Sequence, residues 1–394
     1  MNKKTIHDID ASGKTCLVRV DFNVPTDPAT GLISDDSRIR AAVPTVHHLQ
    51  SKGARIVLCS HNGRPKGKVV EELRMTAIRQ RASDWFNTEV VDAGLPGDGT
   101  DPAAVIAKLA PGGIAMLENL RFNSGEEAND PKFAKALASL ADIYVNDAFG
   151  AAHRAHASTA GVAEHLPAVA GYLMERELKM LTRALESDEK PAVAIIGGAK
   201  VSDKIQVLAN LSKRVDTIII GGGMVAAFLK AQGYEPGAAK ITDEEVHAAG
   251  QLLFSSQAKV MTPADVVVAR EFAENATPYV VEVTDVPSDS LILDIGPRTR
   301  VDYADEIIQA RRIIWNGPMG VAEWESFAEG TRAVARAVSV APDAFTLAGG
   351  GSTVAVVEKL NLRSELTHVS TGGGASLEFL EGKVLPGIAA LDDR

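Results

Sequence analysis

The stretch AVAIIGG, from Ala192 to Gly198, decides the fold, because an apolar, strand-like run delivers the backbone straight into paired glycines. Four more runs in the second half of the chain end in glycine: Thr217 to Ile220, Ile313 to Trp315, Phe345 to Ala348 and Leu366 to Ser370. In an open parallel sheet, ligands bind beyond the carboxyl ends of the strands, where glycine lets backbone N–H groups approach an anion. The second half is therefore predicted to hold phosphates.

The first half repeats this layout with charged side chains at the strand ends. The predicted strands are Cys16 to Val20, Arg55 to Ser60, Ile114 to Leu117 and Ile143 to Val145. If they are parallel, the side chains that follow them converge on one edge; these include His61, Arg64, Arg121, His153 and Arg154. Such an edge suits a small, strongly anionic molecule.

Composition narrows the class of protein. A chain of 394 residues with 45% hydrophobic content is expected to form two α/β domains. The net charge of −10 argues against nonspecific binding of nucleic acid, and no apolar run reaches the roughly 18 residues of a membrane span. We expect a soluble, cytoplasmic protein in which Cys16 and Cys59 are buried, reduced thiols. An amphipathic helix is predicted from Gly171 to Glu186, as a connector between the domains.

Seven motifs together resemble those of the phosphoglycerate kinase family, and they occur in family order. They are RVDFNVP (19–25), SHNGRP (60–65), LENLRF (117–122), VNDAF (145–149), HRAH (153–156), GAKVSDK (198–204) and STGGGAS (370–376). The resemblance spans essentially the whole chain. It implies reversible phosphoryl transfer from 1,3-bisphosphoglycerate to ADP, giving 3-phosphoglycerate and ATP, as in glycolysis and gluconeogenesis.

The resemblance also implies the architecture. Two Rossmann-like, doubly wound parallel-sheet domains would face each other across a cleft: residues 1–170 for 3-phosphoglycerate and 187–376 for the nucleotide, joined by the helix 171–186. Residues 377–394 would return to the first domain. We expect a cytoplasmic monomer that closes by hinge bending, with hinges at the ends of the helix and in the segment from His368 to Thr371.

Arg38 is the first catalytic candidate. The carboxylate nucleophile is already ionised, so catalysis rests on positioning and charge neutralisation rather than on a general base. Ser34, Asp35 and Asp36 predict a helix start that places Arg38 in the first turn, where a cation opposes the helix dipole and favours an anionic partner. The alternative is an ordinary salt bridge to Asp35 or Asp36. By resemblance, Arg38 orients the acid's carboxylate and stabilises the transferring group.

Lys200 and Lys204 stand four residues apart after the first Gly-Gly turn, hence on one face if Lys200 opens a helix. Like charges on one face favour an anion between them, although a solvated lysine face is the alternative. By resemblance, Lys200 steadies the phosphoryl group in flight and Lys204 holds nucleotide phosphates. The turn that contains Gly373 and Gly374 would cap the transferring phosphoryl group.

Two binding sets follow from the resemblance. The acid's 3-phosphate and hydroxyl would be bound by Asp21, Asn23, His61, Arg64, Arg121 and Arg154, with Arg38. The nucleotide would be bound by Gly198, Ala199, Lys204, Gly221, Gly222, Gly296, Asn316, Pro318, Glu323, Gly350, Gly351, Ser352 and Thr353. Glu323 would accept hydrogen bonds from ribose hydroxyls, and its alternative is an exposed helix glutamate. ATP or ADP is the co-substrate, carried with Mg²⁺.

Three positions depart from the family pattern. Asn62 replaces a leucine and Ala322 a phenylalanine, and both are expected to affect packing only. Ser352 stands where the family has an aspartate that helps to hold nucleotide-bound Mg²⁺, and a hydroxyl is a weaker ligand for a hard cation. A catalytically impaired nucleotide- and anion-binding protein of the same fold therefore remains as the alternative. A P-loop ATPase or an NAD-dependent dehydrogenase would lack its main motif, GxxxxGK[ST] or GxGxxG.

Overall fold

A computed structural model describes residues 2–27 and 30–394, and the chain divides into two compact units. Unit 1 comprises Met1–Lys179 and Val384–Arg394, and unit 2 comprises Met180–Lys383. The helix expected at 171–186 is present as α7 (Tyr172–Glu186), but the division falls within it rather than at its ends. The return to unit 1 begins at Val384 rather than at 377, because α14 (Gly374–Leu380) packs against α8 (Ile205–Leu211) in unit 2.

Unit 1 is built on a six-stranded sheet in the order β3-β4-β2-β1-β5-β6, in which every pairing is parallel. Its strands are β1 (Thr15–Arg19), β2 (Arg55–Cys59), β3 (Val90–Gly94), β4 (Ile114–Leu117), β5 (Ile143–Asn146) and β6 (Ala168–Ala170). The four predicted strands are confirmed within one residue at each end, while β3 and β6 were not predicted. The register aligns Arg19 with both Cys59 and Asn146, so the residues after β1, β2 and β5 emerge side by side.

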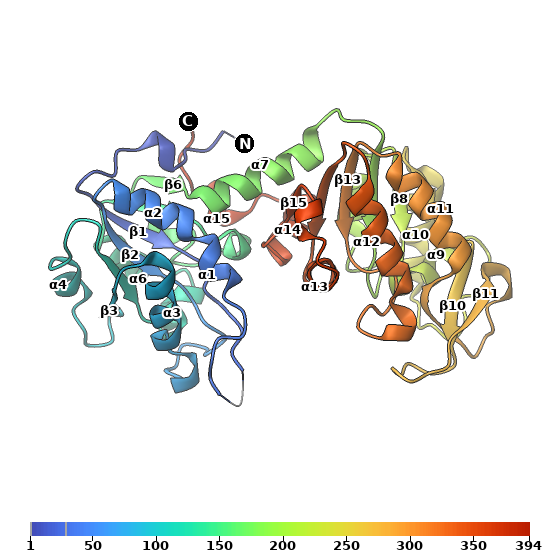
Figure 1. Ribbon diagram of the computed structural model, residues 1–394, viewed down its shortest axis with the longest axis horizontal. Coiled ribbons are helices and arrows are strands. Elements are labelled where there is room, and N and C mark those ends of the chain that lie inside the picture. The colour runs from blue at the N-terminus through green and yellow to red at the C-terminus, as the bar shows by residue number, and fades with distance from the viewer. Residues whose placement is uncertain (1, 28–29) are drawn as a thin grey trace. The chain divides into compact units, whose positions relative to one another are not determined.

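Helices flank this sheet (Figure 1). They are α1 (Ser37–Ala41), α2 (Val43–Ser51), α3 (Thr76–Phe86), α4 (Pro102–Ile106), α5 (Ser124–Glu127), α6 (Pro131–Ala138) and α15 (Pro386–Ala389). The N- and C-terminal segments lie together in unit 1, where the backbone N–H of Lys4 donates to the carbonyl of Asp392 at 2.8 Å. The last residues of the chain therefore complete unit 1.

Unit 2 contains a second all-parallel sheet of six strands, in the order β15-β14-β13-β7-β8-β9. Its strands are β7 (Ala192–Ile196), β8 (Thr217–Ile220), β9 (Lys259–Met261), β13 (Arg312–Asn316), β14 (Phe345–Gly349) and β15 (His368–Val369). The first two agree with the predicted bounds at both ends, and the last is shorter than predicted. The α/β fold class with two parallel sheets is confirmed.

A third sheet in unit 2 was not predicted. It has three antiparallel strands in the order β11-β10-β12, namely β10 (Asp265–Ala269), β11 (Tyr279–Glu282) and β12 (Leu291–Ile295). The remaining helices of the unit are α9 (Val225–Ala231), α10 (Asp243–Ser255), α11 (Pro297–Ile308), α12 (Glu329–Val340) and α13 (Gly351–Lys359).

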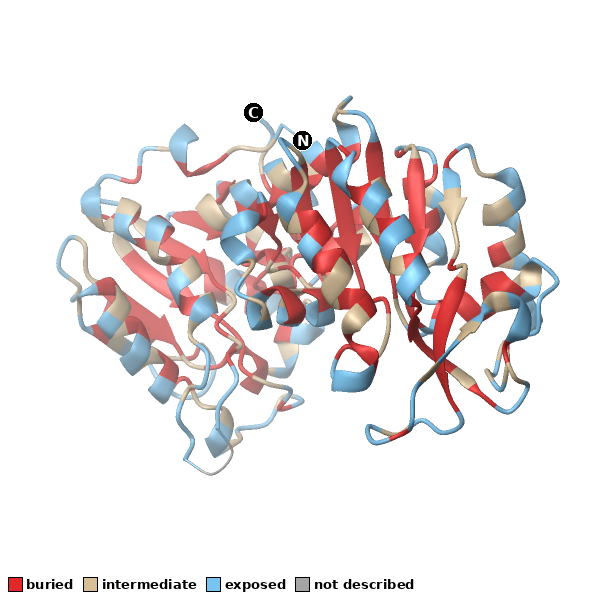
Figure 2. Ribbon diagram, turned by 45° about the vertical axis from the view of Figure 1, so that its right-hand side comes forward, coloured by how far each residue is buried: buried red, intermediate tan, exposed pale blue. Residues whose placement is uncertain are grey.

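The cores lie along the parallel sheets, whose central strands are buried on both faces (Figure 2). Continuous burial of β7, β8 and β13 explains why their sequences are uninterrupted apolar runs rather than alternating ones. Cys16 and Cys59 are free and buried, as expected, and burial raises the pKa of each thiol to about 12. No described helix is long and apolar enough to cross a membrane.

Candidate active site

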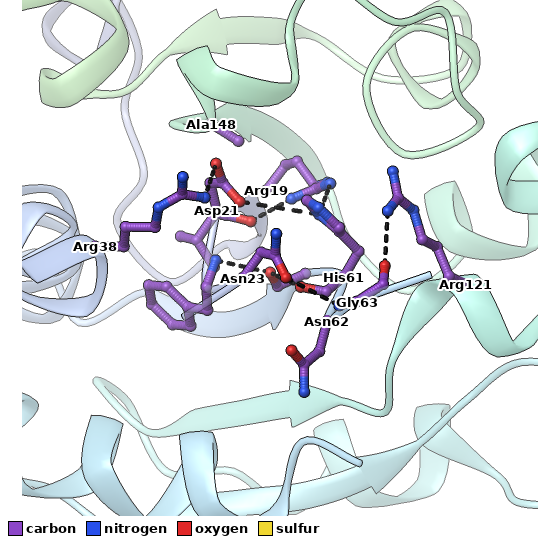
Figure 3. A network of polar contacts seen from close by, with 12 residues as sticks. Arg19, Asp21, Asn23, Arg38, His61, Asn62, Gly63, Arg121 and Ala148 are labelled. Atoms are coloured by element: carbon purple, nitrogen blue, oxygen red, sulfur yellow. Dashed lines mark hydrogen bonds and ion pairs between the residues drawn. The ribbon is translucent and has the colours of Figure 1, made fainter. Parts of the chain in front are cut away.

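The carboxyl edge of the unit 1 sheet gathers polar side chains from neighbouring strands. Asp21 and Asn23 follow β1, and His61 follows β2, within one connected group (Figure 3). The side-chain Oδ1 of Asn23 accepts a hydrogen bond from the backbone N–H of Gly63 at 2.9 Å, which ties the two loops together. Of the side chains predicted to converge on this edge, His61 and Arg121 belong to this group.

Arg38 points at Asp21 rather than at its own helix. Its Nη1 donates to Asp21 Oδ2 at 2.8 Å, and the alternative partners Asp35 and Asp36 are engaged elsewhere. Asp35 accepts from Ser37, while Asp36, at the helix N-cap, binds Arg81 and Trp85. Arg38 lies in the first turn of α1, as predicted, and is half-exposed.

His61 is buried beside a second arginine, to which the motifs alone assign no role. Arg19 Nη2 lies 3.0 Å from His61 Nδ1, and the guanidinium is almost completely buried. Burial lowers the pKa of His61 well below its ordinary value, and the nearby positive charges of Arg19, Arg121 and Arg38 lower this pKa further.

The three remaining predicted arginines differ in how firmly they are held. Arg121 is buried, and its Nη1 donates to the carbonyl of Gly63 at 2.8 Å. Arg154 is partly buried with its Nε 3.1 Å from His153 Nε2. Arg64 is exposed and has no hydrogen-bond or ion-pair partner within residues 2–27 and 30–394. It is free to meet an anion without breaking an existing contact.

The two lysines of unit 2 are not on one helical face. The expectation that Lys200 opens a helix is wrong: α8 begins at Ile205, Lys204 is its N-cap, and Lys200 lies in the loop after β7. Lys204 Nζ donates to Asn316 Oδ1 at 2.5 Å, and burial lowers the pKa of Lys204. Lys200 is exposed in the described structure. Residues 197–204 form bends and turns, so Lys200 and Lys204 do not share a helical face.

A cavity of about 510 Å³ lies beside Lys200 in unit 2. Its predicted lining residues are Gly198, Ala199, Lys200, Gly222, Pro318, Glu323 and Ser352. Glu323 is exposed at the rim, as is Ser352. A concave site with a few polar groups at one end and an apolar wall is the usual form of a small-molecule site.

The apolar wall of the cavity was missed from the sequence. It is formed by Ala226 and Ala227 of α9, Phe272, the β12 residues Leu291, Ile292 and Leu293, and Val321. Most of these residues sit on or beside the unpredicted antiparallel sheet. Their only sequence signal is apolar character, which they share with the core.

Glycine is required where the backbone of this cavity is crowded. A Cβ at Gly222 would lie 2.6 Å from the carbonyl oxygen of Gly198, and Gly222 has φ +72°, so a side chain would both clash and be strained. A Cβ at Gly197 would lie 1.9 Å from the carbonyl oxygen of Pro318. The glycine pairs therefore bring the β7, β8 and β13 loops into contact.

Several predicted nucleotide residues do not line the cavity. They are Lys204, Gly221, Gly296, Asn316, Gly350, Gly351 and Thr353. Asn316 holds Lys204 and also donates from Nδ2 to the carbonyl of Gly349 at 3.1 Å. Buried Thr353 accepts from the backbone N–H of Gly317 at 2.7 Å, so it fixes the loop after β13. These two residues connect neighbouring strand ends behind the cavity.

Gly296 lies in a different setting from the other predicted glycines. It is the N-cap of α11, and a Cβ there would lie 2.2 Å from the carboxyl carbon of Asp265. That carboxylate accepts hydrogen bonds from the backbone N–H groups of Arg298 and Thr299. The position of Gly296 is explained by close packing at this helix start.

Gly373 and Gly374 form the start of α14, and Gly373 has φ +51°, which favours glycine. Ser370 Oγ and Ser376 Oγ lie 2.5 Å apart across this turn, and the backbone N–H of Gly372 donates to Ser370 Oγ. The turn is thus held from beneath by two buried hydroxyl groups.

The described residues contain no group of three or more His, Cys, Asp or Glu side chains able to hold a metal ion. Ser352 occupies the second position of α13 and could supply one neutral oxygen at most. A magnesium ion beside Ser352 would therefore need most of its oxygen ligands from nucleotide phosphates and water.

The other two departures from the family pattern have structural settings. Ala322 is buried within the main apolar core of unit 2. Asn62 is buried, and its backbone is fixed by Asn119, whose Oδ1 accepts from the Asn62 N–H and whose Nδ2 donates to the Asn62 carbonyl. That these two departures affect packing only stays a prediction.

Comparison with known proteins places the chain in one family. The family model described as phosphoglycerate kinase matches residues 6–383. A phosphoglycerate kinase of Moorella thermoacetica is 53% identical over 397 residues, covering 100% of both chains. The solved phosphoglycerate kinase of Coxiella burnetii matches at a TM-score of 0.89 with 42% identity, and that of Pyrococcus horikoshii OT3 at 0.84 with 32% identity. Each structural match covers 98% of both chains. From these matches and from the two strand-end sites, the chain belongs to the phosphoglycerate kinase family.

Proposed function

We propose that the chain performs its family's reaction with the acid bound on unit 1 and the nucleotide on unit 2. As a phosphoglycerate kinase it is a phosphotransferase of glycolysis, and it moves a phosphoryl group reversibly between 1,3-bisphosphoglycerate and ADP. We assign the acid to unit 1 and the nucleotide to unit 2 because the carboxyl edges of the two parallel sheets present different side chains. Unit 1 presents arginines and histidine, whereas unit 2 presents glycine turns, two lysines and an apolar cavity.

On unit 1, the 3-phosphate of the acid meets Arg64, Arg121 and Arg154. Arg64 is unpaired within the described chain, so it can turn to the phosphate at no cost in existing contacts. Arg121 is held by the carbonyl of Gly63 and by Glu127, whose Oε1 lies 3.2 Å from Arg121 Nε. Gly63 is in turn held by Asn23, so the guanidinium is positioned to donate a charge-assisted hydrogen bond to the phosphate. Asp21 accepts hydrogen bonds, which suits the acid's hydroxyl group.

On unit 2, the apolar wall takes the nucleoside and the glycine end takes its phosphates. The wall residues Leu293 and Val321 supply apolar area for a base, and Glu323 at the rim supplies an acceptor for ribose hydroxyls. Lys200, exposed in its loop, can follow the phosphoryl group, while Lys204 stays fixed on Asn316.

The chemical step needs no general base. The attacking group is the ionised carboxylate of 3-phosphoglycerate, so one of its oxygens bonds to the γ-phosphorus while the bond to the β,γ-bridging oxygen breaks. Arg38 and Lys200 neutralise the charge on the transferring group. Ser352 would be the protein ligand of a Mg²⁺ ion carried by the nucleotide, and the ion would offset the negative charge of the phosphates. The enzyme would act as a cytoplasmic monomer with no nucleic-acid partner.

A coupled assay with 3-phosphoglycerate, ATP and Mg²⁺ tests this function. Steady oxidation of NADH by the coupling dehydrogenase is the expected result. Family membership does not favour the impaired binding protein, whose sole basis is Ser352. Tight nucleotide binding without turnover, at any Mg²⁺ concentration, would select that alternative.

A further inference from the structure

Four buried polar side chains form a chain beneath the acid site of unit 1. Glu126 of α5 binds Ser158, Ser158 binds Arg19 at the end of β1, and Arg19 binds His61 after β2. Glu126 and Ser158 are fully buried, and Arg19 and His61 are 1% and 7% exposed. The chain of contacts ends at His61, beside Asp21 and Arg38 (Figure 3).

The direction of each hydrogen bond in this chain is fixed by Arg19. A guanidinium only donates, so Ser158 Oγ must accept from Arg19 Nε at 2.8 Å. The serine proton is then directed to Glu126 Oε1 at 2.6 Å, and the Ser158 backbone N–H donates to Oε2 at 3.0 Å. Both oxygens of Glu126 act as acceptors, which is the pattern of an ionised carboxylate.

The buried charge of Arg19 is compensated by that carboxylate. Burial raises the pKa of Glu126 above its ordinary value, although the positive charge of Arg19 and the two hydrogen bonds from Ser158 oppose this rise. A buried guanidinium without a counter-charge would be strongly destabilising, so the two charges hold each other in place.

The same logic fixes the tautomer of His61. Arg19 Nη2 lies 3.0 Å from His61 Nδ1 and can only donate, so Nδ1 must carry its lone pair. The single proton of the neutral ring is then on Nε2, for which the described residues provide no hydrogen-bond partner. The nearest carboxylate to Nδ1, Asp21 Oδ1, is 4.0 Å away and already shares its group with Arg38.

We propose that Glu126 and Ser158 are positioning residues, which hold Arg19 so that it keeps His61 in the neutral Nε2–H tautomer, ready to donate one hydrogen bond to an oxygen of the acid substrate. The inference rests on the proposed acid site of unit 1. Burial and the positive charges of Arg19, Arg121, Arg38 and His156 all lower the pKa of His61, so the ring stays neutral.

The tautomer is measured directly by long-range ¹H–¹⁵N correlation of the histidine rings in the full chain without substrate. The chain has nine histidines, and the His61 signal is identified by its loss in His61→Gln. The expected pattern is an Nε2–H ring that is still neutral at the ordinary histidine pKa. An Nδ1–H ring, or titration near the ordinary histidine pKa of about 6.5, would overturn the proposal.

Variants test the positioning role. Glu126→Gln removes the counter-charge and Ser158→Ala removes the bridge, so each should release Arg19 from His61 Nδ1 and give mixed tautomers of the His61 ring. Each should also raise KM for 3-phosphoglycerate about tenfold with kcat within about twofold. Ser158→Thr, which keeps the hydroxyl, should restore both readouts. If Glu126→Gln fails to fold, Ser158→Ala decides.

Asp147→Asn is the matched control, because Asp147 is an equally buried carboxylate of unit 1 that accepts from the backbone N–H groups of Leu173 and Met174. It should lower stability while leaving the His61 spectrum unchanged. An unchanged spectrum and KM in both Glu126→Gln and Ser158→Ala would refute the proposal. The spectra need no turnover, so an inactive wild type with the expected tautomer would refute the proposed function instead.

Discussion

At the scale of single residues, Arg38 is the side chain whose removal should be most specific. Arg38→Ala should lower kcat by roughly 10³-fold or more, because a positioned cation on a transferring phosphoryl group contributes that much. ATP affinity should stay nearly unchanged, since Arg38 belongs to unit 1. Initial rates in the coupled assay and nucleotide titration calorimetry measure the two quantities.

Arg40→Ala is the control for Arg38→Ala. Arg40 lies two residues further along α1 and carries the same charge. Its Nε pairs with Asp36 Oδ1 at a distance of 3.2 Å, and not with Asp21. It should keep near-normal turnover. Activity of Arg38→Ala within about threefold of wild type would refute the role assigned to Arg38.

Ser352 tests how the nucleotide's metal is held. Ser352→Asp adds a hard anionic oxygen at the start of α13 and should lower the Mg²⁺ concentration for half-maximal rate. The measurement is a Mg²⁺ titration at fixed ATP, with Ser352→Asn as the neutral control. An unchanged or raised Mg²⁺ concentration for half-maximal rate would show that another group already holds the metal.

Buried histidines make the stability of unit 1 depend on pH. Burial and the charges of Arg121 and Arg19 lower the pKa of His156 from 6.5 to about 4. Between these values the unfolded chain binds more protons, so this residue's contribution to stability falls as pH decreases from about 6.5 to about 4. The loss amounts to about 2 kcal/mol once partial screening by solvent is allowed for.

The contribution of His156 is measured as the difference in free energy of unfolding between wild type and His156→Gln, because other groups titrate in the same pH range. Burial raises the pKa of Asp147 from 3.8 to about 6, and that contribution has the opposite sign because it is lost as pH rises. Denaturant unfolding of wild type and His156→Gln over this range should therefore give a difference that shrinks as pH falls. A difference independent of pH would contradict the neutral, buried state of His156.

At the scale of elements, apolar runs that end in glycine or charge identified the central strands, because strands buried on both faces leave a continuous signal. The same rule could not find β3, whose burial is interrupted, or β6 and β9, which are only three residues long. Nor did it find β10 to β12, because β10 and β11 do not end in glycine, and Gly296 after β12 was singled out without the strand that precedes it. The apolar wall of the unit 2 cavity was missed for that reason.

Candidate site residues could be named from the sequence where a residue's chemistry is unusual for its place. Arg38 and the glycine turns were visible from local sequence alone. Arg19, Glu126 and Ser158 were not identified as a unit, because their association depends on strand register and on a loop more than a hundred residues away. Pairwise contacts of this range leave no periodic signal in one sequence.

The glycine turns give a prediction at the element scale. Gly222→Ala should raise KM for ATP about tenfold and lower stability, because its Cβ would collide with the carbonyl of Gly198 and its φ is +72°. Gly233→Ala is matched, since Gly233 has φ +87° with no atom within 4 Å of the added Cβ. It should cost stability by about 1 kcal/mol through strain alone, with KM unchanged. Equal effects of the two variants on KM would refute the role given to the turn.

At the scale of the whole molecule, positively charged arginine side chains cluster at one place on a chain that is acidic as a whole. The net charge is −10, yet Arg19, Arg38 and Arg121 lie in one polar network of unit 1 (Figure 3). The chain passes between the units at Lys179 to Met180 and again at Lys383 to Val384. The hinge predicted at His368 to Thr371 stays a prediction, and its first two residues form the edge strand β15 within unit 2.

In the proposed mechanism, the acid site of unit 1 and the nucleotide site of unit 2 are two halves of one active site. In-line transfer needs the reacting atoms about 3 Å apart, so the units must approach when both substrates are bound. Small-angle scattering of the protein alone, with 3-phosphoglycerate, with a non-hydrolysable ATP analogue and Mg²⁺, and with both ligands measures this approach. We expect a smaller radius of gyration with both ligands than with either one. An unchanged radius in the presence of both, at saturating concentrations confirmed by calorimetry, would contradict the two-part site.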